Sequence, residues 1–238
     1  MQAIILCAGF GTRLRPLTDS IPKAMVPIAG RPLLERNIEQ YKKFGVTEFL
    51  INLHYLPDVI KNYFGDGSKW GVKIIYKFEP EILGTAGAIK NFEKELDDKF
   101  LLSYGDVLSL VDYGKLYQAY LEKSDAMGIE IVGETSHPHD SDLAEVDENL
   151  KFLKVNRKPH EKLPEKYKSM RGIYVFNKKI TDFIPENKYY EIDHNLLPDI
   201  LDKGLNFYGY ETQDYLKDIG TPERYQKAQE DFKEIIKI

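Results

Sequence analysis

Residues 3–18 of the chain read AIILCAGFGTRLRPLT. The apolar run at residues 3–6 is typical of a β-strand, so the stretch after it is expected to form a turn at the carboxyl end of that strand. Gly9 and Gly11 lie in this turn and carry no Cβ, which lets backbone N–H groups approach an anion closely. The segment therefore predicts an anion-binding turn at the edge of an α/β sheet.

Three cations surround the predicted turn, because Arg13, Arg15 and Lys23 follow the glycines closely. Two familiar phosphate-binding loops can be excluded. A dinucleotide-binding fingerprint needs a third glycine where this chain has Leu14, and a P-loop needs a Gly-Lys-Ser or Gly-Lys-Thr that occurs nowhere in the sequence. A glycine turn ringed with positive charge still suits a triphosphate, so we expect a nucleoside triphosphate site of another type.

The same block resembles the signature of the sugar-1-phosphate nucleotidylyltransferases, the pyrophosphorylases that make nucleotide sugars. Further motifs resemble those of this family in the same order, at residues 65–68, 83–88, 104–106 and 218–222. The chain looks most similar to short mannose-1-phosphate guanylyltransferase-like members. The resemblance implies a Rossmann-like, three-layer α/β/α fold of the nucleotide-diphospho-sugar transferase type. It also implies an enzyme that transfers a nucleotidyl group from a nucleoside triphosphate to a sugar 1-phosphate, with Mg²⁺ as cofactor.

Length and composition fit a globular enzyme. The 238 residues suit one nucleotidylyltransferase domain over residues 1–238, with a nucleotide-binding half at about 1–133 and a sugar-phosphate-binding half, including a lid and the last helix, at about 134–238. A net charge of −5 without a basic stripe argues against a nucleic-acid partner. No apolar run reaches the length of a membrane span and no signal peptide is recognisable, so we expect a cytoplasmic protein without a membrane partner. The oligomeric state is left open, with a homodimer as one alternative.

Strand-like and helical patterns alternate along the first half of the chain. Apolar runs typical of strands lie at residues 3–6, 48–53, 72–76 and 100–103, and helical spacings lie at residues 33–44, 58–64 and 84–96. This alternation predicts a mainly parallel, doubly wound sheet with helices on both faces and the motif-bearing strand ends at one edge.

The second half is less regular. A helix to about residue 121 and a strand at residues 127–132 precede a polar stretch at residues 134–168, which we interpret as a small β-rich insertion or lid over the sugar site. A strand at residues 172–176 and a helix at residues 192–201 follow. Thr221 and Pro222 open the last helix, because threonine is a good N-cap and proline is favoured at the first helical position.

The nucleotide-binding residues are expected on and near the glycine turn. Arg13 is expected to bind the β- and γ-phosphates, because a guanidinium can donate two parallel hydrogen bonds, and Lys23 to stabilise the charge at the α-phosphate; these two are the predicted catalytic residues. A carboxylate at residue 79 or 81 would accept from the N1–H and amino group of a purine and favours guanine, whereas a uracil or thymine site more naturally uses amide groups. The predicted nucleotide-binding set is Ala8, Gly9, Gly11, Thr12, Arg13, Glu79, Glu81, Gly84 and Thr85.

The resemblance assigns the metal ion and the acceptor to other positions. Mg²⁺ prefers one or two carboxylates completed by phosphate and water, and the matching positions are Asp106 and Asp218. The family usually has Glu-Lys-Pro where this chain has Arg157-Lys158-Pro159, so Lys158 keeps the cation for the sugar phosphate while Arg157 replaces the glutamate that would accept sugar hydroxyls. The predicted sugar-phosphate-binding set is Gly105, Lys158, Gly172 and Glu191.

Several substrate pairs remain open. The favoured pair is GTP with a mannose- or heptose-type 1-phosphate, and the alternatives are UTP or dTTP with a glucose- or muramic-type sugar 1-phosphate, or CTP with a phosphocholine-like acceptor for which Tyr167 is an available aromatic residue. A nucleotide-sensing module without catalysis is the alternative outside enzymes. Its mark would be loss of Lys23 or of the two metal aspartates, and all three are present. The 5 histidines lack a metal-binding spacing and are interpreted as structural or surface residues.

Overall fold

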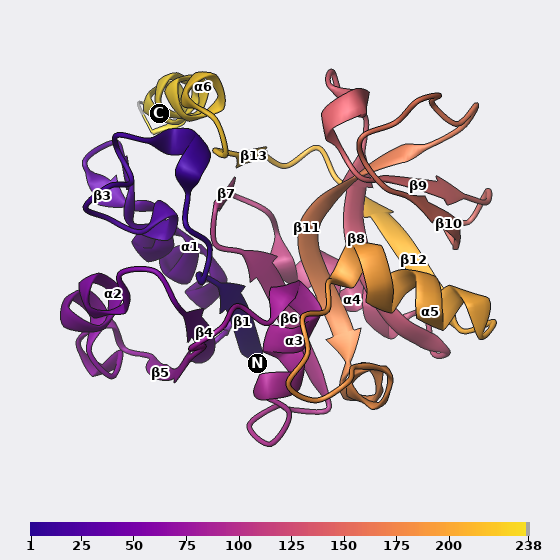
Figure 1. Cartoon of the computed structure of the whole chain (residues 1–238), viewed down its shortest axis with the longest axis horizontal. Helices are drawn as coiled ribbons and strands as arrows, with labels where there is room; N and C mark the ends of the chain where they lie inside the picture. Colours follow the sequence, from indigo (N-terminus) through magenta and orange to yellow (C-terminus); the bar gives the residue numbers. More distant parts are fainter. Residues whose placement is uncertain (237–238) are drawn as a thin grey trace. The chain divides into compact units, whose positions relative to one another are not determined.

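The structure is a computed structural model that describes residues 1–236, so the last two residues of the predicted 1–238 domain lie outside the described residues. The chain folds into two compact units (Figure 1). The first unit comprises Met1–Ile82, Ser103–Asp112 and Asp214–Ile238, and the second comprises Leu83–Leu102 and Tyr113–Gln213. The proposed division into a nucleotide-binding and a sugar-phosphate-binding half stays a prediction.

The first unit is built on parallel strands. β1 (Gln2–Leu6) pairs with β4 (Glu48–Leu53), and β4 pairs with β5 (Lys73–Phe78), both in parallel. β1 and β4 are almost wholly buried, as expected for parallel strands that are covered on both faces and therefore read as continuous apolar runs. Short elements complete this part of the unit: β2 (Pro27–Ile28), β3 (Arg31–Pro32), α1 (Leu33–Lys42), α2 (Pro57–Phe64) and 3-10 helices at Thr12–Leu14, Lys23–Met25 and Ser68–Trp70.

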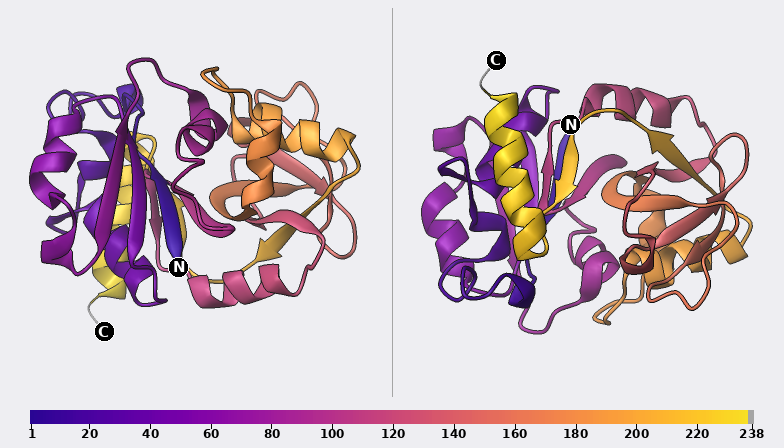
Figure 2. Two further views of the ribbon diagram at one scale, coloured as in Figure 1. Left: turned by 90° about the horizontal axis from the view of Figure 1, so that it is seen from below. Right: turned by 90° about the horizontal axis from the view of Figure 1, so that it is seen from above.

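The end of the chain returns to the first unit. β7 (Val107–Ser109) pairs with β13 (Leu216–Asp218) in antiparallel fashion, and α6 (Pro222–Ile235) follows, shown in yellow in Figure 2. The Thr221 hydroxyl accepts a hydrogen bond from the backbone N–H of Arg224, so the predicted N-cap is confirmed. One apolar cluster joins the start and the end of the chain: Leu14, Val26, Ile28, Leu33, Leu108, Ile219, Ala228 and Phe232.

The second unit is centred on β8 (Ala126–Gly133). β8 pairs with β11 (Lys168–Asn177) in antiparallel fashion and with β12 (Asn206–Glu211) in parallel. β9 (Leu143–Val146) and β10 (Phe152–Asn156) form a hairpin, and β9 also pairs with β11. The helical elements are α3 (Gly84–Asn91), α4 (Tyr113–Leu121), α5 (Leu197–Asp202), 3-10 helices at Pro138–Asp140 and Lys178–Phe183, and a π-helix at Ile192–Leu196. β6 (Lys99–Tyr104) carries the chain from this unit back into the first.

The predicted α/β fold of strands flanked by helices is confirmed, and the differences lie at the ends of elements. The helix expected at residues 84–96 ends at Asn91, and residues 92–95 continue in single turns in which the Glu95 N–H donates to the Phe92 carbonyl. Phe92 and Leu96 stay buried in these turns, which preserves the apolar spacing that indicated a longer helix. The predicted β-rich pieces around residues 144 and 152 are β9 and β10, whereas β12 was not predicted.

No helix within residues 1–236 is long and apolar enough to cross a membrane.

Candidate active site

The glycine turn begins where β1 ends. The Cys7 N–H donates to the Asn52 side-chain oxygen at 2.8 Å, and the turn then closes as a 3-10 helix in which the Leu14 N–H donates to the Gly11 carbonyl at 2.9 Å. The N–H groups at the start of such a helix have no partner within it and point outward. Gly11 has a φ of 66°, and a Cβ there would lie 3.1 Å from Thr18 and 3.2 Å from Lys23, so only glycine suits this position.

The predicted phosphate-binding cations meet a predicted metal carboxylate around Gly220. A Cβ placed on Gly220 would lie 2.7 Å from Asp218 Oδ1, 3.1 Å from Arg13 Nη2 and 3.1 Å from Lys23 Nζ. Lys23 Nζ also forms an ion pair with the Asp106 carboxylate. The structure therefore brings together four predicted residues from three separate motifs: the N-terminal block, which supplies both cations, and the segments of Asp106 and Asp218.

The two predicted metal ligands lie on neighbouring segments, because Asp218 ends β13 and Asp106 directly precedes β7. Asp218 pairs with Val107 in the β7–β13 ladder, and the Ile219 N–H donates to the Asp106 carbonyl at 3.0 Å. Both carboxylates contact cations in the protein. Asp106 forms the ion pair with Lys23, and Asp218 Oδ2 lies 2.7 Å from Arg224 Nη1. No group of three metal-ligating side chains occurs among the described residues, but Mg²⁺ is commonly held by one or two carboxylates completed by phosphates and water. The donor set of Asp106 and Asp218 fits such an ion.

The two candidate base-reading glutamates differ in their surroundings. Glu79 is 1% exposed, and Glu79 Oε1 accepts a hydrogen bond from the Asn52 amide at 2.9 Å. Because the same Asn52 side chain accepts from the Cys7 N–H, it ties the Glu79 carboxylate to the start of the glycine turn. Glu81 is exposed. The geometry therefore favours Glu79 as a fixed hydrogen-bond acceptor.

Gly84 and Thr85 belong to the second unit, at the start of α3. Gly84 has a φ of 76°, and a Cβ there would lie only 2.6 Å from the Tyr190 carbonyl oxygen. Thr85 Oγ1 accepts from the Ile192 N–H at 2.7 Å. These contacts fix the beginning of α3 to the segment at residues 190–192, and the role of the two residues in base binding stays a prediction.

Lys158 and Glu191, two residues of the predicted sugar-phosphate-binding set, are joined by a chain of contacts in the second unit. Lys158 Nζ lies 3.5 Å from Asp142 Oδ2, His194 Nε2 lies 3.1 Å from Asp142 Oδ1, and His194 Nδ1 lies 2.9 Å from Glu191 Oε2. We call Asp142, Lys158, Glu191 and His194 the Asp142 cluster. It provides a cation beside two carboxylates that an imidazole bridges.

Gly172 is held at a bulge in β11 by a buried glutamate. Glu130 Oε1 accepts from the Gly172 N–H at 3.0 Å and from the Arg171 N–H at 2.9 Å, and no hydrogen-bond partner reaches Glu130 Oε2 within the described part of the chain. Burial, together with the charge of Asp193, raises the pKa of Glu130 well above its usual value. The bulge gives Gly172 a φ of 69°, a conformation that favours glycine.

Gly105, the remaining residue of the predicted sugar-phosphate-binding set, lies in the first unit. Its N–H donates to the Leu6 carbonyl at 2.9 Å, and a Cβ there would lie 2.6 Å from the same oxygen. The glycine allows the chain to pass the end of β1 and to place Asp106 beside Lys23. Cys7 is buried nearby, and burial followed by the charge of Asp106 raises the pKa of its thiol, which suits a packing residue.

Residues that we did not predict take part in the contacts around the glycine turn and Gly220 and in the Asp142 cluster. Asn52 could have been found as a polar residue within the apolar strand FLINL, because a buried amide needs partners. Arg224 follows the predicted N-cap closely but carries no sequence signal for its contact with Asp218. Asp142 and His194 lie in polar stretches where aspartate and histidine are ordinary surface residues, so spacing alone could not identify them.

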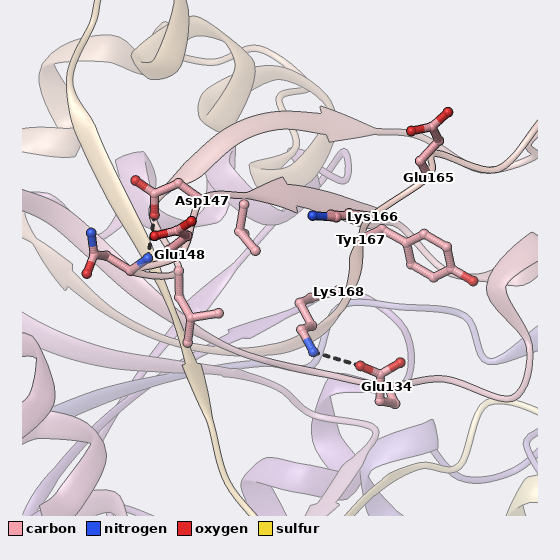
Figure 3. Close-up of a pocket in the computed structure, with 10 residues that line it drawn as sticks. Glu134, Asp147, Glu148, Glu165, Lys166, Tyr167 and Lys168 are labelled. Carbon is pink, nitrogen blue, oxygen red and sulfur yellow. Dashed lines mark hydrogen bonds and ion pairs between the residues drawn. The ribbon is translucent and has the colours of Figure 1, made fainter.

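A cavity of about 860 Å³ lies elsewhere in the second unit (Figure 3). Lys168 on its wall forms ion pairs with Glu134 at 2.7 Å and Glu211 at 3.0 Å. Tyr167 contributes the single aromatic ring among the lining residues, and no predicted site residue is among them. The lining residues are Glu134, Val146, Asp147, Glu148, Asn149, Leu150, Glu165, Lys166, Tyr167 and Lys168.

Two curated relatives match nearly the whole of this chain. The chain is 34% identical, over 96% of its length, to a UTP--glucose-1-phosphate uridylyltransferase from Synechocystis sp., of which it covers 62%. It is also 34% identical, over 94% of its length, to a D-glycero-alpha-D-manno-heptose 1-phosphate guanylyltransferase from Campylobacter jejuni, of which it covers 97%. A crystal structure of HddC from Yersinia pseudotuberculosis complexed with GMP-PN superimposes with a TM-score of 0.78 and 30% identity, covering 97% of this chain and 99% of that one.

The lengths of the relatives differ. The chain spans only about 62% to 65% of several curated relatives that it matches, among them a mannose-1-phosphate guanylyltransferase from Mycobacterium tuberculosis with 32% identity over 97% of this chain and 64% of that protein. The profile of the family described as nucleotidyl transferase matches residues 2–235, almost the whole chain. The glycine turn, its cations and the two aspartates all fall within this match, and the chain belongs to the nucleotidyl transferase family.

Proposed function

We propose that the protein transfers a nucleotidyl group from a nucleoside triphosphate to a sugar 1-phosphate. The observation that carries the proposal is the meeting of Arg13, Lys23 and Asp218 around Gly220, beside the glycine turn of a nucleotidyl transferase family member. Two anionic reactants repel each other, so an enzyme for this reaction has to supply positive charge and alignment more than proton transfer.

In the proposed reaction an oxygen of the acceptor's phosphate attacks the α-phosphorus in line. A bond forms between that oxygen and the α-phosphorus, the bond from the α-phosphorus to the oxygen that bridges it to the β-phosphorus breaks, and pyrophosphate leaves. Arg13 binds the β- and γ-phosphates through its guanidinium. Lys23 faces the α-phosphate, and its ion pair with Asp106 keeps the ammonium in place.

Asp106 and Asp218 would hold the Mg²⁺ ion. When bound, Mg²⁺ supplies positive charge to the phosphate oxygens and orients the triphosphate. The protein's part is to keep two carboxylates on adjacent segments, Asp218 at the end of β13 and Asp106 just before β7, with Lys23 and Arg13 beside them.

GTP with a mannose- or heptose-type 1-phosphate is the favoured pair. The buried Glu79 carboxylate, fixed by Asn52, can accept from the two donors on guanine. The full-length relative from Campylobacter jejuni is named a guanylyltransferase, and the HddC structure contains GMP-PN. The uridylyltransferase relative keeps UTP with glucose 1-phosphate as the alternative pair. We expect the enzyme to act in the cytoplasm, where nucleoside triphosphates are made.

The experiment is a matrix of GTP, UTP, dTTP and CTP against mannose, heptose and glucose 1-phosphates and phosphocholine, with pyrophosphate release as the readout. We expect steady release that needs Mg²⁺, nucleotide and acceptor together and is fastest with GTP and the mannose or heptose compound. Tight nucleotide binding without pyrophosphate from any acceptor would instead identify a nucleotide-sensing module. Fastest release with CTP and phosphocholine would show that the acceptor is not a sugar phosphate. A quaternary ammonium group would need aromatic side chains around it, and Tyr167 is the single aromatic residue among the described residues that line the cavity.

A further inference from the structure

A carboxylate without an assigned role lies directly beside Lys158. Asp142 Oδ1 accepts from the backbone N–H of Lys158 at 3.1 Å, and Asp142 Oδ2 lies 3.5 Å from its ammonium. Arg157, which stands where the family usually has glutamate, donates from its guanidinium to the carbonyl oxygen of His194. The position before Lys158 therefore offers no carboxylate, while Asp142 offers one from another part of the chain.

The orientation of Asp142 is fixed from several sides. Its backbone carbonyl accepts from the Met170 N–H at 3.0 Å, and its side chain is 11% exposed. His194 bridges Asp142 Oδ1 and Glu191 Oε2 at 3.1 Å and 2.9 Å. Glu191 Oε1 in turn accepts from the Tyr189 hydroxyl at 2.8 Å. The two carboxylates of the Asp142 cluster are thus held at a set spacing, with part of each side chain open to solvent.

We propose that Asp142 binds a hydroxyl group of the acceptor sugar and that His194 is the positioning residue that holds Asp142 and Glu191 for this contact. The inference rests on the proposed function and deepens it by assigning the part of the site that recognises the sugar. A sugar hydroxyl donates well to a carboxylate, and a sugar 1-phosphate carries hydroxyls next to the phosphate that Lys158 is expected to bind. Asp142 then supplies the carboxylate oxygen that accepts a hydrogen bond from the sugar hydroxyl, which the Arg157 side chain cannot do.

A different role for Asp142 makes the opposite prediction. If its carboxylate only neutralised Lys158, removing the charge would free the ammonium for phosphate, and the acceptor would bind more tightly. If it binds a hydroxyl, removing the charge weakens acceptor binding, and only for acceptors that carry that hydroxyl. The sign of the change and its dependence on the sugar therefore separate the two roles.

The test compares the wild type with Asp142→Asn, using mannose 1-phosphate and its 2-, 3-, 4- and 6-deoxy forms, or the glucose series if the substrate matrix selects glucose. We expect the KM for the full sugar to rise about tenfold or more, the size of effect that losing a charged hydrogen bond produces, while the KM for the nucleotide stays unchanged. With one deoxy form the wild type and the variant should become equal. Asp182→Asn, an exposed aspartate of the same unit, is the matched control.

A second pair of variants tests the contact of His194 with Asp142 and Glu191. It also shows whether a loss of binding comes from misfolding. Asp142→Ser and His194→Ala are measured in the same way, after their melting curves are matched to the wild type, and both should raise the acceptor KM far more than they change kcat. An unchanged or lowered acceptor KM in folded Asp142 variants, or an equal penalty with every deoxy form, would overturn the inference. A wild type that releases no pyrophosphate with any acceptor would instead refute the proposed function.

Discussion

At the scale of single residues, the site depends on charges that the fold holds close together. Lys23 Nζ contacts Asp106 and lies beside Gly220 together with Arg13. The Lys23 side chain is only 14% exposed, so its ammonium has a restricted position, as its proposed role at the α-phosphate requires. Such preorganised charge is worth several kcal/mol in comparable electrostatic sites.

We therefore expect Lys23→Met to lower kcat by about a hundredfold or more, because the charge at the α-phosphate is lost while the apolar stem is kept. Pyrophosphate release under saturating substrates measures the effect. Lys61→Met, on the exposed face of α2, should behave like the wild type. A folded Lys23→Met protein with near-normal turnover would show that this lysine has no part in the reaction.

Base selection is a second prediction at this scale. Glu79→Gln replaces a pure acceptor by an amide that also donates, so one of the two guanine donors would face an N–H. We expect kcat/KM for GTP to fall at least about tenfold and the ratio of GTP to UTP turnover to fall with it. Glu122→Gln, at an exposed position, provides the control. An unchanged GTP to UTP ratio would remove Glu79 from base recognition.

The sequence reveals those residues whose chemistry is tied to a local pattern. Gly9, Gly11 and Lys23 stand out because glycines and cations follow a strand-like run. Asn52 stands out as a polar residue in an apolar strand, but its partner Glu79 does not follow from the pattern, and Asp142 does not stand out because its partner His194 lies far along the chain. Such pairs form only when the sheet register and the turns are fixed, and a single sequence does not contain that information.

At the scale of elements, the last helix shows how a local signal is used. Thr221 caps α6, and Pro222 occupies its first turn. The capped helix follows directly after Asp218 and Gly220, so the start of the helix sets where that carboxylate lies. Apolar contacts of Ala228 and Phe232 hold the rest of the helix to the first unit.

Thr221→Ala should lower the free energy of unfolding by about 1 kcal/mol, since an N-cap hydroxyl satisfies an N–H that the helix cannot. Denaturation by urea measures the change. Thr221→Ser keeps the hydroxyl and should recover most of the stability. Equal midpoints for the alanine and serine variants would mean that the hydroxyl does not stabilise α6.

Element boundaries follow tertiary contacts more than periodicity. The helix expected to reach residue 96 stops at Asn91, because turns keep Phe92 and Leu96 buried without further helix. β12 escaped prediction because its segment NFYGYE contains a central glycine and two half-exposed tyrosines. It becomes a strand through pairing with β8, which lies far away in the sequence. The strand at residues 48–53, by contrast, was predicted to the residue as β4, and the strand at residues 3–6 to within one residue as β1.

At the scale of the whole molecule, one buried carboxyl links stability to pH. Burial and the charge of Asp193 raise the pKa of Glu130 above its usual 4.5, so the folded protein holds this proton more tightly than the unfolded chain does. Its contribution to stability is therefore fully present below pH 4.5 and is lost as the pH rises through the folded-state pKa.

Glu130→Gln should remove this dependence, because the amide oxygen can still accept from the Gly172 N–H and carries no titrating proton. As the pH rises above the ordinary glutamate value, the free energy of unfolding of the wild type should fall relative to the variant, by roughly 1.4 kcal/mol for each unit by which the pKa is raised. Urea denaturation between about pH 5 and pH 8, the range in which proteins tend to be most stable, measures the difference. Glu161→Gln, an exposed change, should track the wild type, and parallel curves for wild type and Glu130→Gln would contradict the prediction.

The path of the chain through the two units affects how the protein is made. Residues 83–102 and 113–213 form the second unit, whereas the first unit waits for the segment that begins at Asp214. Because a ribosome releases residues in order at about 5–20 per second, the second unit can mature on the nascent chain while the first still lacks β13 and α6. A chain interrupted before that last segment would carry the glycine turn without Asp218, and the proposed role of Asp218 implies that such a chain would be inactive from the outset.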